Sequence, residues 1–377
     1  MPLLMIPCKC TSSLPAHRIS LGVKLLIMTF RIAGTLVILP LAVAGVIAAS
    51  SGLPSAPLSS LQIYFIDVEG GQSTLFVTPD KHSLLIDTGW PDAESRDAQR
   101  IASAAKAAGI ERIDDVLLTH YHVDHTGGVP QLVAKIPVGT FIDHGPNREV
   151  TDGSTVQAAE AYQRVLATQH YGHLVPKPGD VLSIQGMKIT VVSADGNLIA
   201  QPLPGGGGAN QYCAFSEKRP ADQTENARSL GVLINYGKLR ILDLGDLTWD
   251  KEMELMCPVN KLGHIDLLVV SHHGWNQSSS PALVDAIAPR VAIMDNSAKK
   301  GGSPSVWDTV EKAPGLEDLW QLHYSEEGGP THNVEAARIA NLQGPDTGNY
   351  LKVAAYPSGR LEVFNARTGT TKQYPPK

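Results

Sequence analysis

The chain has 377 residues, enough for one large domain or two small ones, and a formal net charge of −6 at pH 7. Its apolar content of 43% is that of a globular protein with a sizeable core. The first fifty residues hold four of the 31 basic residues and none of the 37 acidic ones, so the rest carries a net charge of −10. An acidic body does not attract polyanions at long range, which disfavours nucleic acid as a partner, although a local basic groove stays open.

Residues 1–50 have the pattern of a secretory signal. Arg31 precedes an almost wholly apolar run, Ile32–Ala49, and small residues follow it. Because this run is borderline in length for a membrane span, an uncleaved N-terminal anchor is the alternative, and a buried helix is a third reading. Residues 51–60 are rich in proline and serine and read as a linker. We therefore expect an exported protein, periplasmic or secreted, that touches a membrane only through an uncleaved N-terminal segment.

The body, residues 61–377, alternates between strands and helices. Its first part predicts strands at 61–68, 73–77 and 82–87, a helix at 95–108, a strand at 113–119, a helix at 128–134, a strand at 138–142, a helix at 156–168 and a hairpin at 181–183 and 188–192. A polar, glycine-rich segment, 196–224, is expected to be a long surface loop. The second part predicts strands at 230–235 and 239–244, a helix at 249–256, a strand at 265–270, a helix at 281–287, a strand at 291–294, a helix at 334–341 and a hairpin at 351–356 and 360–365.

Two cysteines, Cys213 and Cys257, lie in this body, and two more lie in the leader. Two cysteines so far apart form no disulfide framework and have no metal-ligand spacing. We expect both to be unpaired. A single bridge is the alternative if the body faces an oxidising compartment.

Four metal-ligand side chains occur within six residues at the end of an apolar strand: His120, His122, Asp124 and His125. In extended backbone the side chains of His120 and His122 point to the same side, so both can coordinate one ion. The chain must then turn, which lets Asp124 and His125 face a second ion. Imidazole and carboxylate suit zinc, and also iron or manganese. The alternative, a histidine-rich surface loop, does not account for such dense packing of ligands at a strand end.

This H-x-H-x-D-H signature resembles the metallo-β-lactamase superfamily, and its closest branch contains the hydrolase domain of the DNA-uptake channel and phosphorylcholine esterase. Four further segments match in order: Phe65–Gln72, Leu85–Gly89, Leu242–Asp246 and Val269–Gly274. The resemblance extends from about Leu61 to Tyr324. It implies an α+β fold, the four-layer αββα sandwich of that superfamily.

The resemblance also implies roles for individual residues. Asp246, which follows an apolar strand and a glycine, would bridge two metals, although alone it would read as a turn residue. Asp124 would ligate one ion and orient the attacking hydroxide, and Asp87 would support a ligand histidine or its loop. Of the adjacent pair, His272 is preferred as a ligand, with His273 as a neighbouring or substrate contact.

One position departs from the branch. A further histidine is expected in a glycine-histidine-proline context, where this chain has Ser303 between Gly302 and Pro304. Two other histidines, His144 and His323, follow predicted or candidate strands and could replace it as a metal ligand or contact the substrate.

Together these features predict a hydrolase with two divalent ions, zinc being favoured over manganese and iron. A hydroxide shared by the ions would cleave an ester, lactone or phosphodiester bond in a small molecule. The alternatives are an exported nuclease related to the DNA-uptake branch, a β-lactamase, and a non-catalytic metal-binding protein.

Overall fold

The computed structural model describes residues 60–377 except 92–93 and 169. These residues all belong to one unit of the chain, Leu53–Lys377. The predicted signal or anchor and nearly all of the linker lie outside them. Within the described part of the chain, no helix is both long enough and apolar enough to cross a membrane.

The first sheet is built from both ends of this unit. Its strands are β1 (Leu61–Phe65), β2 (Thr74–Val77), β3 (Ser83–Ile86), β4 (Ile113–Leu117), β5 (Val138–Ile142), β6 (Gly172–Leu174), β16 (Leu351–Ala355), β17 (Leu361–Asn365) and β18 (Thr370–Tyr374). Their order is β18-β17-β16-β1-β2-β3-β4-β5-β6. The strands are antiparallel from β18 to β3, and parallel from β3 to β6.

The second sheet comes from the middle of the chain. Its strands are β7 (Val181–Ile184), β8 (Met187–Ala194), β9 (Asn197–Leu198), β10 (Gly231–Tyr236), β11 (Leu239–Asp243), β12 (Leu267–Val269), β13 (Val291–Met294), β14 (Asp318–His323) and β15 (Ile339–Asn341). The order is β15-β14-β13-β12-β11-β10-β8-β7, and β9 pairs with β8. The strands from β11 to β15 run parallel, so the carboxyl ends of these strands share one edge.

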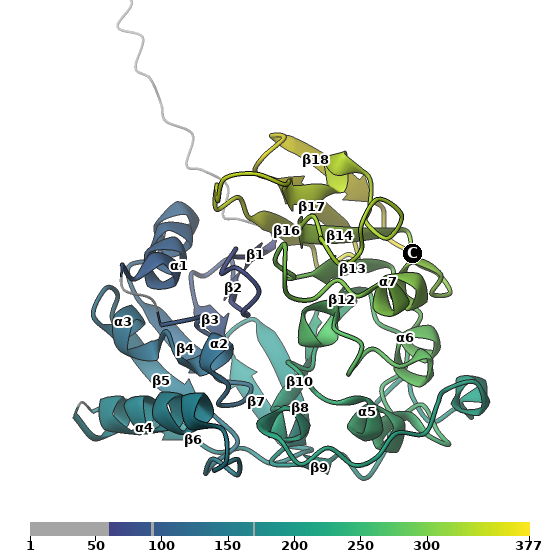
Figure 1. Ribbon diagram of the computed structural model, residues 1–377, viewed down its shortest axis with the longest axis horizontal. Coiled ribbons are helices and arrows are strands. Elements are labelled where there is room, and N and C mark those ends of the chain that lie inside the picture. Colours follow the sequence, from purple (N-terminus) through teal and green to yellow (C-terminus); the bar gives the residue numbers. More distant parts are fainter. Residues whose placement is uncertain (1–59, 92–93, 169) are drawn as a thin grey trace, which may run out of the picture. The chain divides into compact units, whose positions relative to one another are not determined.

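Helices cover the outer face of each sheet (Figure 1). Three lie on the first sheet: α1 (Arg96–Ala108), α3 (Val129–Val133) and α4 (Gly153–Thr168). Three lie on the second: α5 (Trp249–Met256), α6 (Pro281–Ile287) and α7 (Pro304–Glu311). A short helix, α2 (Val123–Thr126), follows β4, and four 3₁₀ turns are η1 (Gln211–Ala214), η2 (Glu225–Arg228), η3 (Ser271–Gly274) and η4 (Ala336–Arg338). The arrangement confirms the predicted α+β, four-layer αββα sandwich.

Strand periodicity explains why the sandwich has four layers. In β1, Leu61, Ile63 and Phe65 belong to the core between the sheets, whereas Tyr64 packs under the helices of the first sheet. Successive strand side chains point to opposite faces, and here both faces are apolar. Each sheet therefore needs a partner on either side, and three buried clusters fill the space between the four layers.

The predicted helix at 334–341 is wrong. Residues Ile339–Asn341 form β15, which pairs with β14, and only the turn η4 precedes it. Ile339 is 1% exposed, and the Asn341 side chain donates to the Leu322 carbonyl at 3.0 Å, so tertiary pairing overrides the local helical pattern. Helix α7 was not predicted either; it begins with Pro304, which Ser303 separates from two glycines.

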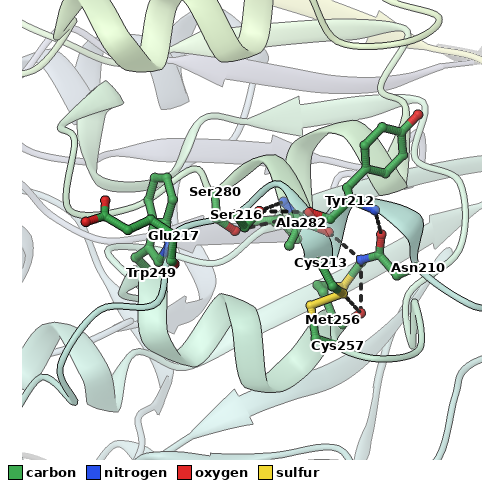
Figure 2. Close-up of a disulfide and its surroundings, with 11 residues drawn as sticks. Asn210, Tyr212, Cys213, Ser216, Glu217, Trp249, Met256, Cys257, Ser280 and Ala282 are labelled. Atoms are coloured by element: carbon green, nitrogen blue, oxygen red, sulfur yellow. Dashed lines mark hydrogen bonds between the residues drawn. A yellow bond between two sulfur atoms is a disulfide. The ribbon is translucent and has the colours of Figure 1, made fainter.

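The expectation of unpaired cysteines is also wrong, because Cys213 and Cys257 form a disulfide with an S–S distance of 2.05 Å (Figure 2). The segment around Cys213 is further held by Asn210, whose side-chain amide donates to the carbonyls of Met256 at 3.0 Å and Ala282 at 2.8 Å. The latter part of the predicted loop at 196–224 is therefore tied to α5 and α6.

Candidate metal centre

The signature segment turns sharply where β4 ends. His120 is fully buried, and His122 stands at the start of α2 with its side chain 22% exposed. The two imidazole rings lie edge to face with their centroids 4.7 Å apart. Asp124 and His125 follow in α2, and the His125 Nε2 atom lies 3.3 Å from Asp124 Oδ2. The extended and then helical backbone thus presents all four side chains at one edge of the first sheet.

Asp246 comes from the second sheet and lies at the centre of these groups. It follows β11 and Gly245, which has a left-handed backbone (φ +55°). A Cβ atom on Gly245 would lie 2.7 Å from the Cβ atom of Thr119, so only glycine lets the two strand ends come this close. The Asp246 Oδ2 atom is 3.3 Å from His125 Nε2 and 3.8 Å from His120 Nε2.

The adjacent histidines lie in η3, where β12 ends. Both have left-handed backbones, with φ values of +57° for His272 and +54° for His273. The Nε2 atom of His273 lies 3.3 Å from Asp124 Oδ2 and 3.6 Å from Asp246 Oδ1. The Nε2 atom of His272 lies 3.4 Å from Asp246 Oδ2. Both rings therefore reach Asp246, but only His273 also lies within 3.3 Å of Asp124.

The donors form two groups that share Asp246, and in each group one donor atom of every residue lies within 4.8 Å of the others. One group consists of His120, His122 and Asp246; the other consists of Asp124, His125, Asp246 and His273. Among the described residues, His120 Nε2 and Asp246 Oδ1 are buried without a hydrogen-bond partner. Unpartnered buried atoms are costly, and nitrogen and carboxylate donors in this arrangement fit divalent zinc, manganese or iron.

The charges of two donors, His120 and Asp124, suit metal binding. Burial and the neighbouring imidazoles of His125 and His122 hold the pKa of His120 well below its usual value, so its ring is neutral. Burial alone would raise the pKa of Asp124, but the Lys300 ammonium and His125 hold it well below normal. Metal ligands must be deprotonated, and both residues meet that condition at neutral pH.

Asp87 orients the His125 ring by contacting the ring nitrogen that faces away from the other donors. Its Oδ2 atom lies 2.7 Å from His125 Nδ1 and accepts a hydrogen bond from the Thr119 hydroxyl at 2.6 Å. The Thr119 backbone N–H donates to the other oxygen at 2.8 Å. Asp87 is fully buried, and that burial raises its pKa. This contact occupies Nδ1 of His125 and leaves Nε2 to face Asp124 and Asp246.

The structure does not bring His144 or His323 to these two groups. His144 pairs with Glu225, with 2.9 Å between Nε2 and Oε2. The Nε2 atom of His323 lies 2.7 Å from Asp67 Oδ1, and Asp67 is also bound by Arg100 at 3.1 Å. Each histidine therefore has a carboxylate partner away from Asp246.

Two charged neighbours of the centre were not predicted from the sequence. Glu149, in the segment after β5, lies 3.1 Å from His122, measured from Oε2 to Nε2. Lys300 contacts Asp124 through its ammonium group. Glu149 has no local sequence signal. Lys300 stands three residues before Ser303, the position of the missing histidine, and that departure could have directed attention to it.

Residues 67–214 match the family model of the metallo-beta-lactamase superfamily. Over 129 residues it is 36% identical to an atrochrysone carboxyl ACP thioesterase of Aspergillus fumigatus, a match covering 33% of this chain and 28% of that protein. Over 239 residues it is 26% identical to competence protein ComA of Neisseria gonorrhoeae, covering 63% of this chain and 27% of that protein. The matches therefore span little more than a quarter of these relatives.

Among solved structures, the metallo-beta-lactamase fold protein YhfI from Bacillus subtilis matches with a TM-score of 0.43 and 14% identity. The match covers 69% of this chain and 95% of that one.

Proposed function

We propose that this chain is a hydrolase that uses two divalent metal ions, with zinc favoured over manganese and iron. The observation that carries the proposal is the pair of donor groups that share Asp246 and contain unpartnered buried atoms. When bound, such a pair of ions supplies an activated water as nucleophile and stabilises negative charge on the bond being cleaved.

One ion would be held by His120, His122 and Asp246. The related branch has a further ligand histidine where this chain has Ser303. Glu149 is our candidate for this missing ligand, because its Oε2 atom lies 3.1 Å from the Nε2 atom of His122. The segment that carries Glu149 is anchored as well, since the Glu225 backbone N–H donates to the same oxygen at 2.8 Å.

The second ion would be held by Asp124, His125, Asp246 and His273. The sequence favoured His272, but the geometry favours its neighbour. His273 lies 3.3 Å from Asp124 and 3.2 Å from His125, so it completes their group. His272 contacts Asp246 on its own and has Asn226 and Ser278 at 3.5 and 3.4 Å.

The chain's own residues would position the reactants. Asp124 would orient the attacking water, and Asp87 would keep the His125 ring turned toward the centre through its 2.7 Å contact. Substrates would be small molecules with an ester, lactone or phosphodiester bond. A thioester joins this set because one relative is named a thioesterase.

A nuclease is the second candidate, favoured by the match to a competence protein over 63% of this chain. The net charge of −10 outside the first fifty residues opposes it, because binding to a phosphate backbone depends on lysine and arginine. A non-catalytic metal-binding protein is the third. We place the protein outside the cytoplasm, and the Cys213–Cys257 disulfide supports this location.

The first test is elemental analysis of metal in the purified full-length chain, compared with His122→Ala. The matched control is His264→Ala, which removes an exposed histidine that belongs to neither donor group. We expect about two equivalents of metal, clearly fewer in His122→Ala and an unchanged number in the control. Esters, thioesters, lactones, phosphodiesters and single-stranded DNA would then be screened as substrates.

About one equivalent in the wild type would replace the two-metal mechanism with a mononuclear one. No metal after reconstitution would exclude a metal-dependent hydrolase. Metal without hydrolysis of any substrate class would favour the binding protein, and salt-sensitive cleavage of DNA would favour the nuclease.

A further inference from the structure

A lysine lies beside the candidate metal centre and has no role in holding metal. The Lys300 ammonium contacts Asp124 Oδ2, and its side chain is 19% exposed, so it faces both the donor group and solvent. Two tryptophan rings flank it, with the Nζ atom 5.2 Å from the Trp90 centroid and 5.6 Å from the Trp275 centroid. Flat aromatic walls favour a cation and limit water around it, which strengthens its interaction with a negative charge.

The backbone fixes this lysine relative to the centre. The Ser297 hydroxyl accepts from the Lys300 N–H at 3.0 Å, and the Ser297 N–H donates to the Lys300 carbonyl at 2.9 Å. Gly301 and Gly302 then adopt left-handed backbones, and the Gly302 N–H donates to the His273 carbonyl at 3.0 Å. A Cβ atom on Gly301 would lie 2.0 Å from that carbonyl oxygen. The segment is thus built to pack directly against a donor-bearing turn.

The balance of charge in the metal-loaded site indicates a role for the Lys300 ammonium. Two divalent ions carry four positive charges, and Asp124, Asp246 and the candidate ligand Glu149 together carry three negative ones. When metal is bound, the Asp124 carboxylate is a metal ligand. Its negative charge is then shared between the ion and the Lys300 ammonium. A cation added to an already positive site is unfavourable unless an anion binds there.

We propose that Lys300 is a specificity-determining residue that binds an oxyanion of the substrate, carboxylate or phosphate, beside the bond to be cleaved. The substrate class is then an anionic small molecule rather than a neutral ester or lactone. This inference rests on the proposed metal-dependent function. It adds the charge of the substrate, which neither the fold nor the metal donors specify.

The test uses the full-length, zinc-loaded chain and inorganic phosphate as the probe, titrated by calorimetry. Lys300→Met removes the charge with little change in length, and Lys300→Arg keeps the charge. Lys299→Met is the matched control, because that neighbouring lysine is exposed. We expect Lys300→Met to keep its metal content and to bind phosphate roughly 10- to 100-fold more weakly. Lys300→Arg should retain most of the affinity, and Lys299→Met should match the wild type.

A second readout compares substrates with one leaving group: neutral 4-nitrophenyl acetate, anionic mono-4-nitrophenyl succinate and anionic bis(4-nitrophenyl) phosphate. The ratio of kcat/KM for each anionic substrate to that for the acetate should fall in Lys300→Met. The succinate ester reports on carboxylate recognition and the diester on phosphate recognition.

The outcomes separate the two proposals. If the chain binds metal but Lys300→Met leaves phosphate affinity and the substrate ratios unchanged, the role of Lys300 is wrong and the metal-dependent function stands. If Lys300→Met gains an equivalent of metal, the ammonium occupies a metal's place and the role is again wrong. If the wild type takes up no metal, both proposals fail.

Discussion

The two histidine-bearing turns of the candidate metal centre were predictable to very different degrees. In the first, from His120 to His125, an extended segment leads into the helix α2, and the direction of each side chain follows from ordinary periodicity. In the second, His272 and His273 are consecutive left-handed residues. Periodicity does not apply to such a backbone, and both side chains reach Asp246.

Backbone strain in the second turn is maintained by the segments around it. Two non-glycine residues with positive φ cost on the order of 1–3 kcal/mol each and persist only where neighbouring contacts impose them. Here the His272 N–H donates to the Gly245 carbonyl at 3.1 Å, and the Gly302 N–H donates to the His273 carbonyl at 3.0 Å. The first turn is set by its own sequence, whereas the second is set by the segments packed against it.

Asp246 should produce the largest effect, because it is the residue that both turns contact. Asp246→Asn should reduce bound metal from about two equivalents to at most one and lower kcat/KM roughly 1,000-fold or more. Elemental analysis and steady-state kinetics measure both quantities. Asp308→Asn, which changes a partly exposed aspartate on α7, is the control. An Asp246→Asn variant with full metal content would show that the donor groups do not share this carboxylate.

The support of the second turn can be tested through Glu252, a fully buried residue of α5. Its carboxylate accepts from the backbone N–H groups of Ser279 at 2.8 Å and Ser280 at 2.6 Å, just beyond the turn. Burial raises the pKa of Glu252 to about 7, against an ordinary value of 4.5. The folded state therefore holds the proton more tightly, and this stability is complete below about pH 4.5 and lost as pH rises through about 7.

For the metal-free chain in chelator, urea unfolding at pH 5, 6.5 and 8 should show the wild type losing roughly 3 kcal/mol of unfolding free energy from this group. Glu252→Gln should lack that loss, although it is less stable at pH 5. Glu254→Gln, on the exposed face of the same helix, should keep it. If the unfolding free energies of the wild type and Glu252→Gln changed with pH in parallel, Glu252 would not be the source of the pH dependence.

Separate alanine variants of His272 and His273 can show which of the two is the metal ligand. His273→Ala should weaken binding of one metal ion at least about 100-fold, because a ligand matters more than the residues that support ligands. His272→Ala should change metal affinity much less. Competition with a chromophoric chelator measures both affinities. The reverse ranking would restore His272, the residue that the sequence favoured, as the ligand.

The smallest expected effect compares an aspartate at a strand end in each half of the chain. Asp87 holds His125, so Asp87→Asn should weaken metal binding roughly 10- to 100-fold. Asp243 instead accepts from Gln72 at 2.8 Å and Gly245 at 3.0 Å and contacts no donor histidine. Asp243→Asn should leave metal affinity within a few fold. Equal losses in the two variants would mean that Asp87 acts on the fold rather than on His125.

The sequence predicted most strands well, because apolar alternation and turn residues are local signals, and the resemblance carried by its H-x-H-x-D-H signature implied the four-layer fold. It also predicted the local cluster from His120 to His125 and the position of Asp246. It did not predict Glu149, Lys300 or the partners of His144 and His323, since these contacts join segments far apart in the chain. The strand β15 was missed for the same reason, because its pairing with β14 outweighs its own propensity.

The Cys213–Cys257 disulfide determines how the protein responds to cleavage of its surface. Lys218 is exposed and lies between the two cysteines. A protease that cuts after Lys218 would place the turn from His120 to His125 on one fragment and Asp246 with the second turn on the other. The bridge would keep these fragments covalently joined, so they would run together on a denaturing gel and separate only after reduction. A nicked molecule would therefore keep both halves of its metal centre in one covalent unit.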